Sequence, residues 1–268
     1  MSMRATMMAA AAALAVAGGA GCADAQAGQG GLAARVAAAP DGEVWMHFAS
    51  RPGVCGGEHG ISTSRRSSTR TVVRGSDEDG WGCEEGPVWV ALARRAGQVS
   101  GVRVRIGRGW STEGRRVTDL GAVGVHDASA YLLSLAERGA GGRVGEEAIL
   151  PATLADSVTT WPALLRIARK DGLAEGTRRS AVFWLGQQAG ERVTRELSAF
   201  VGDAEEDREL RKHAVFALSQ RPREEAVPEL VHIARTHRDP EIRQTAMFWL
   251  GQSGDPRALA LFEEILRK

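Results

Sequence analysis

Apolar and polar positions in the second half of the chain recur with a helical period, and one pattern is written three times. Its copies read TRRSAVFWLGQ, LRKHAVFALSQ and IRQTAMFWLGQ at Thr177–Gln187, Leu210–Gln220 and Ile242–Gln252. Their alanines, Ala181, Ala214 and Ala246, are 33 and then 32 residues apart. Repetition at that period is typical of a helical solenoid, in which each helix pair buries its apolar face against its neighbours.

A second apolar pattern lies about ten residues beyond each copy and predicts a partner helix. Its two columns consist of Leu197, Leu230 and Phe262, and of Phe200, Ile233 and Ile265. The predicted copies therefore lie near 161–187, 193–220 and 226–252, with a final helix at 257–267. The same step carried backwards predicts a degenerate first copy near 127–157, where Pro151 stands in the place of Trp184 and Asp127 is the expected N-cap. Terminal copies are usually atypical because they cap the stack.

The preceding region, residues 41–120, changes to a period of two. Glu43–Phe48 is a predicted strand, and Thr69–Arg74 is a short β-branched run. The alternation from Val88 to Ile106 around Ala96-Gly97 predicts a hairpin. We expect a small antiparallel β unit that docks on the first helices, because so few strands are marginal alone. Residues 28–40 are mostly small and are interpreted as a linker. The predicted fold class is mainly α, an α-solenoid preceded by this β unit.

The first 27 residues have the form of a signal peptide. Arg4 supplies a positive charge, Met7–Ala20 an apolar run, and Ala23-Asp24-Ala25 or Ala25-Gln26-Ala27 a cleavage site. No later stretch is apolar for 18 residues, so we expect an exported protein, periplasmic or extracellular. Cys22 leaves an alternative, cleavage before a lipid-modified cysteine, and membrane attachment is expected only in that case.

Export would place Cys55 and Cys83 in an oxidising compartment, and two cysteines suit one disulfide. The alternative is a metal site that combines these cysteines with His59 and His47. Its spacing matches no common zinc module, so no metal is predicted. The acidic loop at Asp77–Asp79 lacks the spacing of a calcium loop and is interpreted as solvated.

Charge and motifs exclude several classes of function. The net charge of +1 argues against nucleic acid as a partner. Arg94–Arg116 contains seven arginines against one acid, which indicates a solvated strand face or contact with an anionic surface. The chain has no G-x-S-x-G, H-E-x-x-H or phosphate-binding glycine loop, so neither enzymatic activity nor a cofactor is predicted.

The loop and helix start at Asp239-Pro240-Glu241-Ile242-Arg243, followed by A-x-x-x-L-G, resemble bacterial HEAT repeats of the type also found in phycobilin lyases. The resemblance covers residues 127–268. It implies a ladder of loop Asp and helix Arg residues along the stack, here Asp207 with Arg211 and Asp239 with Arg243. The first strong copy departs from it, with Ala174 at the Asp position of Arg178. Such repeats serve many partners, so the resemblance predicts a fold more than a function.

In the frame of these repeats the Ala and Leu columns face the core, and the second helix of each pair lines the concave side. The Phe column falls where most such repeats carry a polar residue. Residues four apart share a helix face, so the basic and amide positions on either side extend the same stripe. The predicted binding residues are Arg179, Phe183, Gln187, Lys212, Phe216, Gln220, Gln244, Phe248 and Gln252. Alternatively, the Phe rings pack between neighbouring second helices.

These patterns predict an exported binding or scaffold protein of a bacterial envelope, which engages a protein or peptide partner on its concave face. Two alternatives stay open. One is an enzyme or metal-binding module in the β unit. The other is an accessory subunit whose terminal helix, Leu259–Leu266, packs on a partner because no following helix covers it.

Overall fold

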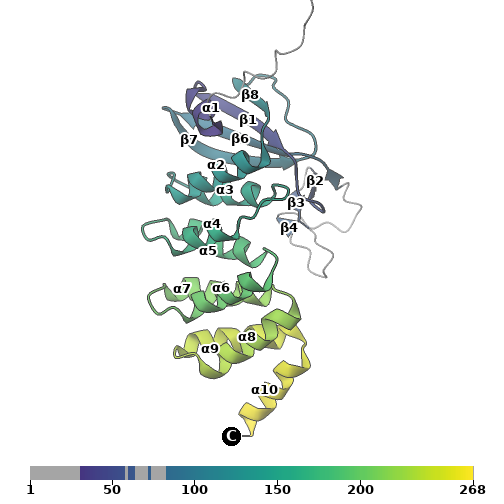
Figure 1. Ribbon diagram of the computed structural model, residues 1–268, viewed down its shortest axis with the longest axis vertical. Coiled ribbons are helices and arrows are strands. Elements are labelled where there is room, and N and C mark those ends of the chain that lie inside the picture. Colours follow the sequence, from purple (N-terminus) through teal and green to yellow (C-terminus); the bar gives the residue numbers. More distant parts are fainter. Residues whose placement is uncertain (1–30, 58–59, 64–71, 74–82, 268) are drawn as a thin grey trace, which may run out of the picture.

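The computed structural model describes residues 31–57, 60–63, 72–73 and 83–267. A β unit lies at one end, and helix pairs stack below it along the longest axis of the molecule (Figure 1). The predicted α-solenoid preceded by a β unit is therefore confirmed.

The first sheet of the β unit is mixed. Its strand order is β7-β6-β1-β8, formed by Gln98–Ile106, Val88–Arg95, Gly42–Phe48 and Val117–Ala122. The predicted hairpin is the antiparallel pair β6–β7. The expectation of a purely antiparallel unit is wrong, because β8 pairs with β1 in parallel. After β7 the chain crosses to the opposite edge of the sheet, where β8 runs in the direction of β1 and leads into the first helix pair.

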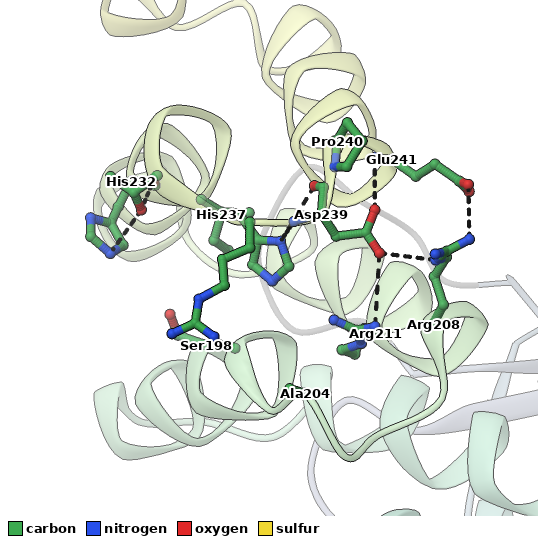
Figure 2. Close-up of a pocket in the computed structure, with 13 residues that line it drawn as sticks. Ser198, Ala204, Arg208, Arg211, His232, His237, Asp239, Pro240 and Glu241 are labelled. Carbon is green, nitrogen blue, oxygen red and sulfur yellow. Dashed lines mark hydrogen bonds and ion pairs between the residues drawn. The ribbon is translucent and has the colours of Figure 1, made fainter.

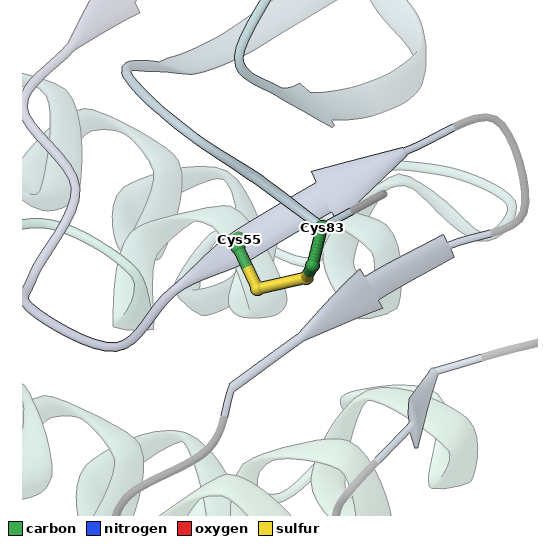
Figure 3. Close-up of a disulfide and its surroundings, with 2 residues drawn as sticks. All are labelled: Cys55 and Cys83. Atoms are coloured by element: carbon green, nitrogen blue, oxygen red, sulfur yellow. A yellow bond between two sulfur atoms is a disulfide. The ribbon is translucent and has the colours of Figure 1, made fainter. Parts of the chain in front are cut away.

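The second sheet is small and carries the disulfide. Its strand order is β4-β3-β2-β5, formed by Val72–Val73, Gly60–Ser62, Cys55–Gly57 and Glu84–Glu85. Cys55 in β2 is bonded to Cys83, with their Cα atoms 5.3 Å apart (Figure 3), so the predicted disulfide is confirmed. The acidic loop at 77–79 and His59 lie outside the described residues, and β4 is the described part of the β-branched run.

A short helix, α1 (Leu32–Ala38), occupies most of the stretch interpreted as a linker over 28–40, so that interpretation is wrong there. Leu32 and Val36 are one turn apart and both buried, and the guanidinium of Arg94 donates to the carbonyl of Val36. Alanine-rich sequence favours a helix once one face is covered. The predicted signal peptide and Cys22 lie outside the described residues.

The helix pairs follow as α2 with α3, α4 with α5, α6 with α7 and α8 with α9, and α10 stands last. Their bounds are Val125–Glu137, Val144–Thr153, Trp161–Arg169, Glu175–Gly186, Glu191–Gly202, Arg208–Ser219, Arg223–Thr236, Pro240–Ser253 and Pro256–Leu266. We call α3, α5, α7 and α9 the second helices; each packs on the next. Asp127 is not the N-cap of α2, because the helix already begins at Val125 after Gly124.

The core runs without interruption from the β unit through the array. As the pattern predicts, the Ala and Leu columns are buried, namely Ala181, Ala214, Ala246, Leu185, Leu218 and Leu250. The backbone N–H of Val102 in β7 donates to Glu147 of α3, and Ser50 forms a β-bridge with Ala155. The β unit is therefore docked on the first helix pair.

Two second helices approach each other at a glycine. A Cβ placed on Gly186 at the end of α5 would lie 2.9 Å from the Cβ of Ala217 in α7. The glycine of the third copy, Gly251, has no comparable neighbour, since its nearest atom would be Cζ of Phe262 at 4.0 Å. The glycine at this position of the repeat therefore permits close helix packing at Gly186 but has no such role at Gly251.

Candidate interaction groove

A row of aromatic rings crosses the second helices. The rings of Phe183 on α5 and Phe216 on α7 are stacked, with centroids 6.2 Å apart and planes at 15°. Trp249 on α9 continues the row, 4.9 Å from Phe216, and Phe248 lies edge-on to Trp249 at 5.0 Å. We call these four residues the aromatic row. Three successive repeats thus build one continuous aromatic surface.

The aromatic row differs from the regular Phe ladder that the repeat predicts. Rings one repeat apart would lie roughly 10 Å apart if each stayed on its own helix. Phe183 and Phe216 are instead in stacking contact and half-buried, whereas Phe248 is 57% exposed. Trp249 takes the place next to Phe216, because its larger side chain reaches across from the position that the small Ala217 holds one repeat earlier. Within the Phe column, Phe183 and Phe216 therefore pack between neighbouring helices, whereas Phe248 is exposed.

The basic residues predicted for the site flank this row and are already neutralised. Lys212 and Phe216 line one pocket of about 410 Å³ together with Arg179. The Nζ atom of Lys212 lies 3.1 Å from Glu209 and 3.5 Å from Glu241. The hydrogen bond to Glu209 raises the pKa of Lys212 above its ordinary value. This flank contributes little net charge.

Two further residues complete the flank. His213 lies beside Phe216, and burial, assisted by the charge of Arg179, lowers the pKa of its imidazole. Gln244 and Phe248 line a small adjoining pocket of about 280 Å³, which shares Lys212 with the first. The flank therefore presents a neutral imidazole, an amide and rings.

The predicted amides lie together in a separate groove at the C-terminal ends of the second helices. Gln187, Gln220 and Gln252 line a groove of about 500 Å³, and Trp249 joins it to the aromatic row. Helices pack roughly 10 Å apart, so three repeats span roughly 20 Å. An extended chain advances about 3.3 Å per residue, so about six residues would fit along this length. Each amide offers both donors and an acceptor to a peptide backbone.

The floor of this groove contains an arginine that the repeat does not predict. Arg221 is 7% exposed; its Nε donates to Thr194 and its Nη2 to Gly190 O and Glu225. Burial raises the pKa of Glu225, but the hydrogen bonds from Thr194 and Arg221 outweigh it and leave that pKa lowered. The other copies carry Gln188 and Ser253 at this position, so no periodic signal marks it. Arg221 fixes the loop between α5 and α6.

The wall of the groove includes two residues of the β unit, Arg51 and Thr63. Neither was predicted. Their proximity to the second helices depends on how the small sheet folds back beside the array, which leaves no periodic signal in the sequence (Figure 1).

The predicted ladder of acids and arginines lies at the N-terminal ends of the second helices. Its ion pairs join residues of neighbouring copies rather than residues of one copy. Asp239 caps α9 and accepts a hydrogen bond from Arg208 of the preceding copy at 2.9 Å, with Arg211 at 3.8 Å. Figure 2 shows both arginines directed at this carboxylate, in a pocket of about 640 Å³. The carboxylate of Asp239 and both arginines that line this pocket are already paired with one another.

The other copies complete the ladder in different ways. Arg178 reaches Glu206 of the next copy at 2.6 Å, and its own copy has no side-chain cap at Ala174. Arg243 in the last copy donates to the carbonyls of His237 and Arg238 instead. The ladder holds the repeats in register, and we assign it a structural role.

The disulfide takes Cys55 and Cys83, two of the four ligands of the metal alternative. His47 lies against Trp89 in the first sheet, with ring centroids 4.3 Å apart and planes tilted by 32°. Over 31–57, 60–63, 72–73 and 83–267, no three His, Cys, Asp or Glu residues are arranged to hold a metal ion. No helix among the described residues is both long and apolar enough to cross a bilayer.

Stacked helix pairs with a shared core and an acid–arginine ladder define an α-solenoid. Residues 201–268 match the HEAT repeat family, so this segment consists of HEAT repeats and the resemblance is confirmed there. A search of curated proteins found no match. HEAT repeats commonly mediate protein interactions, which supports a protein partner in general terms.

Proposed function

We propose that this chain is an exported scaffold protein of a bacterial envelope that binds a partner protein through an extended segment. The segment lies across the second helices, on the face we expect to be concave. One observation carries the proposal: the aromatic row and three glutamines from successive repeats lie along one side of α5, α7 and α9.

The chemistry of this surface suits a peptide better than a small ligand. Aromatic side chains are the residues that most often dominate binding energy at interfaces, and they lose little conformational freedom when they bind. Phe248 and Trp249 expose ring surface for apolar side chains. Gln187 and Gln220 can satisfy backbone N–H and C=O groups that would otherwise lose water.

The test is selection of displayed random octapeptides on the oxidised protein, followed by affinity measurements on variants. The two groove variants are Phe248→Ser, at an exposed residue of the adjoining aromatic row, and Gln220→Ala, at a half-buried residue of the groove itself. Each is expected to weaken binding about tenfold or more. Arg195→Ser is the control, because Arg195 is exposed on α6 outside the groove. Binding that is equally sensitive to the control, or insensitive to both groove variants, would refute the proposal.

Export is supported by the form of residues 1–27 and by the disulfide, since disulfides persist mainly in oxidising compartments. The measurement is the N-terminal residue of the protein purified from fractionated cells. We expect it near Gln26 or Gly28. A soluble protein that begins at Met1 or Ser2 would contradict export, and a lipid-modified Cys22 would replace a soluble protein with a tethered one.

A second candidate, an accessory subunit, has one observation in its favour. Leu259, Ile265 and Leu266 of α10 are exposed, whereas the residues one repeat earlier in α8, Val227, Ile233 and Ala234, are buried. This surface would suit a helix of another subunit. Leu266→Asp should then abolish a stable complex without loss of helical signal; an unchanged complex would exclude this role.

A further inference from the structure

The groove that holds the glutamines repeats once per helix pair. Gln187, Gln220 and Gln252 hold the same position in successive copies and line it together. Packed helices lie about 8–10 Å apart, so the same amide recurs at about that interval across the second helices. A segment that fits all three copies equally well must present the same groups at this interval.

Extended backbone conformations differ in what they present at this interval. Residues two apart in a β-strand share a face but lie only about 6.6 Å apart, whereas residues three apart span about 10 Å and point to opposite faces. A polyproline II helix has three residues per turn and rises about 3.1 Å per residue, so every third residue returns to the same face after about 9.3 Å. Of these two conformations, polyproline II is the one whose faces recur at the spacing of the helix pairs.

The groove also offers hydrogen-bond donors that the fold leaves unused. Within the part of the chain that the structure describes, no group accepts a hydrogen bond from the indole N–H of Trp249 or from the amides of Gln187 and Gln252. The amide of the neighbouring Gln188, by contrast, donates to the carbonyl of Trp184. A polyproline II segment has no internal hydrogen bonds, and proline has no N–H, so its carbonyl oxygens require donors alone. The unused donors are therefore electrostatically complementary to such a segment.

The flank of the aromatic row suits an uncharged segment. Its two cations are already paired, because Arg179 lies 3.2 Å from Glu175 and Lys212 lies 3.1 Å from Glu209. A charged segment would have to compete with these pairs, whereas an apolar ring placed on Phe216 would leave them intact. Proline supplies such a ring, and its fixed φ means that little conformational freedom is lost on binding.

We propose, building on the proposed peptide groove, that the partner segment is rich in proline and binds as a polyproline II helix. Every third residue faces the aromatic row, where proline rings lie on Phe216 and Trp249. The carbonyl oxygens between these residues accept hydrogen bonds from the indole of Trp249 and from the glutamine amides. Each repeat thus reads one turn of the segment.

The experiment is the sequence and alanine analysis of octapeptides selected from a random display library with the oxidised protein. We expect the selected peptides to share prolines three residues apart. Replacement of these prolines by alanine keeps an apolar residue but frees φ, and it should weaken binding about tenfold. Apolar residues that alternate with a period of two, without proline, would indicate a bound strand and overturn the inference.

Trp249→Phe keeps an aromatic ring in the row but removes the indole N–H. It should weaken binding of the selected peptides about fivefold, the scale of one hydrogen bond. The matched control is Trp110→Phe, because Trp110 is a half-buried tryptophan of the β unit outside the groove and its replacement should leave the affinity unchanged. An unchanged affinity of Trp249→Phe would contradict the inference.

The failure of this inference and the failure of the proposed function give different results. Peptides that need Gln220 and Phe248 but contain no proline, or lose nothing when proline becomes alanine, would overturn the inference and leave the groove intact. Peptides that are indifferent to Gln220 and Phe248 as well would overturn both.

Discussion

The same substitution at the same position of two repeats should change stability in opposite directions. Gly186 ends α5 in the sequence WLGQ, and Gly251 stands in the same four letters in α9. Neither has a positive φ, so alanine is compatible with both backbones. Gly186→Ala and Gly251→Ala therefore differ mainly in what the new methyl group meets.

The magnitudes follow from the packing. Carbon atoms normally approach to about 3.5–4.0 Å, so a methyl 2.9 Å from Ala217 forces α5 and α7 apart. Such overpacking costs about 1–3 kcal/mol, and the higher helix propensity of alanine returns at most about 1 kcal/mol. We expect Gly186→Ala to lose about 1–2 kcal/mol. Gly251→Ala meets an atom no closer than 4.0 Å and should gain about 0.5–1 kcal/mol.

Urea unfolding followed by far-ultraviolet circular dichroism measures both free energies of unfolding. A variant that keeps the slope with urea and shifts the midpoint has changed stability alone. The reasoning is refuted if Gly186→Ala is as stable as Gly251→Ala, because α5 and α7 would then not be in close contact.

Three other expectations concern the core, the disulfide and the last helix. Leu218→Ala should lower the free energy of unfolding by about 2–5 kcal/mol, since this leucine is fully buried. Leu266→Ala, at an exposed position, should change it by no more than about 0.5 kcal/mol. A small loss at Leu218 would mean that the helical register is wrong. Replacing Cys55 and Cys83 by serine should cost the β unit about 3–4 kcal/mol, from a crosslink between residues 28 apart; equal unfolding midpoints of oxidised and reduced protein would contradict this. The side-chain and backbone hydrogen bonds from Arg257 lower the pKa of Asp255, the N-cap of α10, from 3.8 to about 2. The folded state then binds this proton less readily than the unfolded state, so α10 should lose stability as the pH falls from about 4 towards 2; amide exchange in α10 should show this loss, and Asp255→Asn should remove the pH dependence.

The array could be predicted because its information is periodic. Ala181 and Leu185 recur one repeat later as Ala214 and Leu218, and each recurrence fixes a core position by its helical spacing alone. The hairpin β6–β7 was equally accessible, since alternation around Ala96 is a local signal.

Features that depend on tertiary contacts were missed or misjudged. The small residues of α1 predict a linker, because only the folded chain supplies a core that covers Leu32 and Val36. The parallel pairing of β8 depends on where the chain crosses the sheet, which no local pattern records. Trp249 belongs to the aromatic row because it is larger than Ala217, which holds the same position one repeat earlier.

In the candidate site, too, the residues that recur with the repeat could be predicted and those that do not recur could not. Gln187, Gln220 and Gln252 were found because they recur, and the structure lines one groove with them. Arg51 and Thr63 come from more than a hundred residues earlier in the chain and share no period with the array. Only the folded chain brings them to the groove.

Cross-linking in cells that produce the protein tests the central claim most directly. A photoreactive benzophenone side chain is placed at Gln220 in the groove and, in a matched variant, at Arg195, which is exposed on α6 away from the groove. We predict that illumination yields a covalent adduct with a partner protein from position 220 but not from position 195. Adducts from position 195 alone, or none from position 220 while the protein is folded and exported, would contradict a binding face on the second helices.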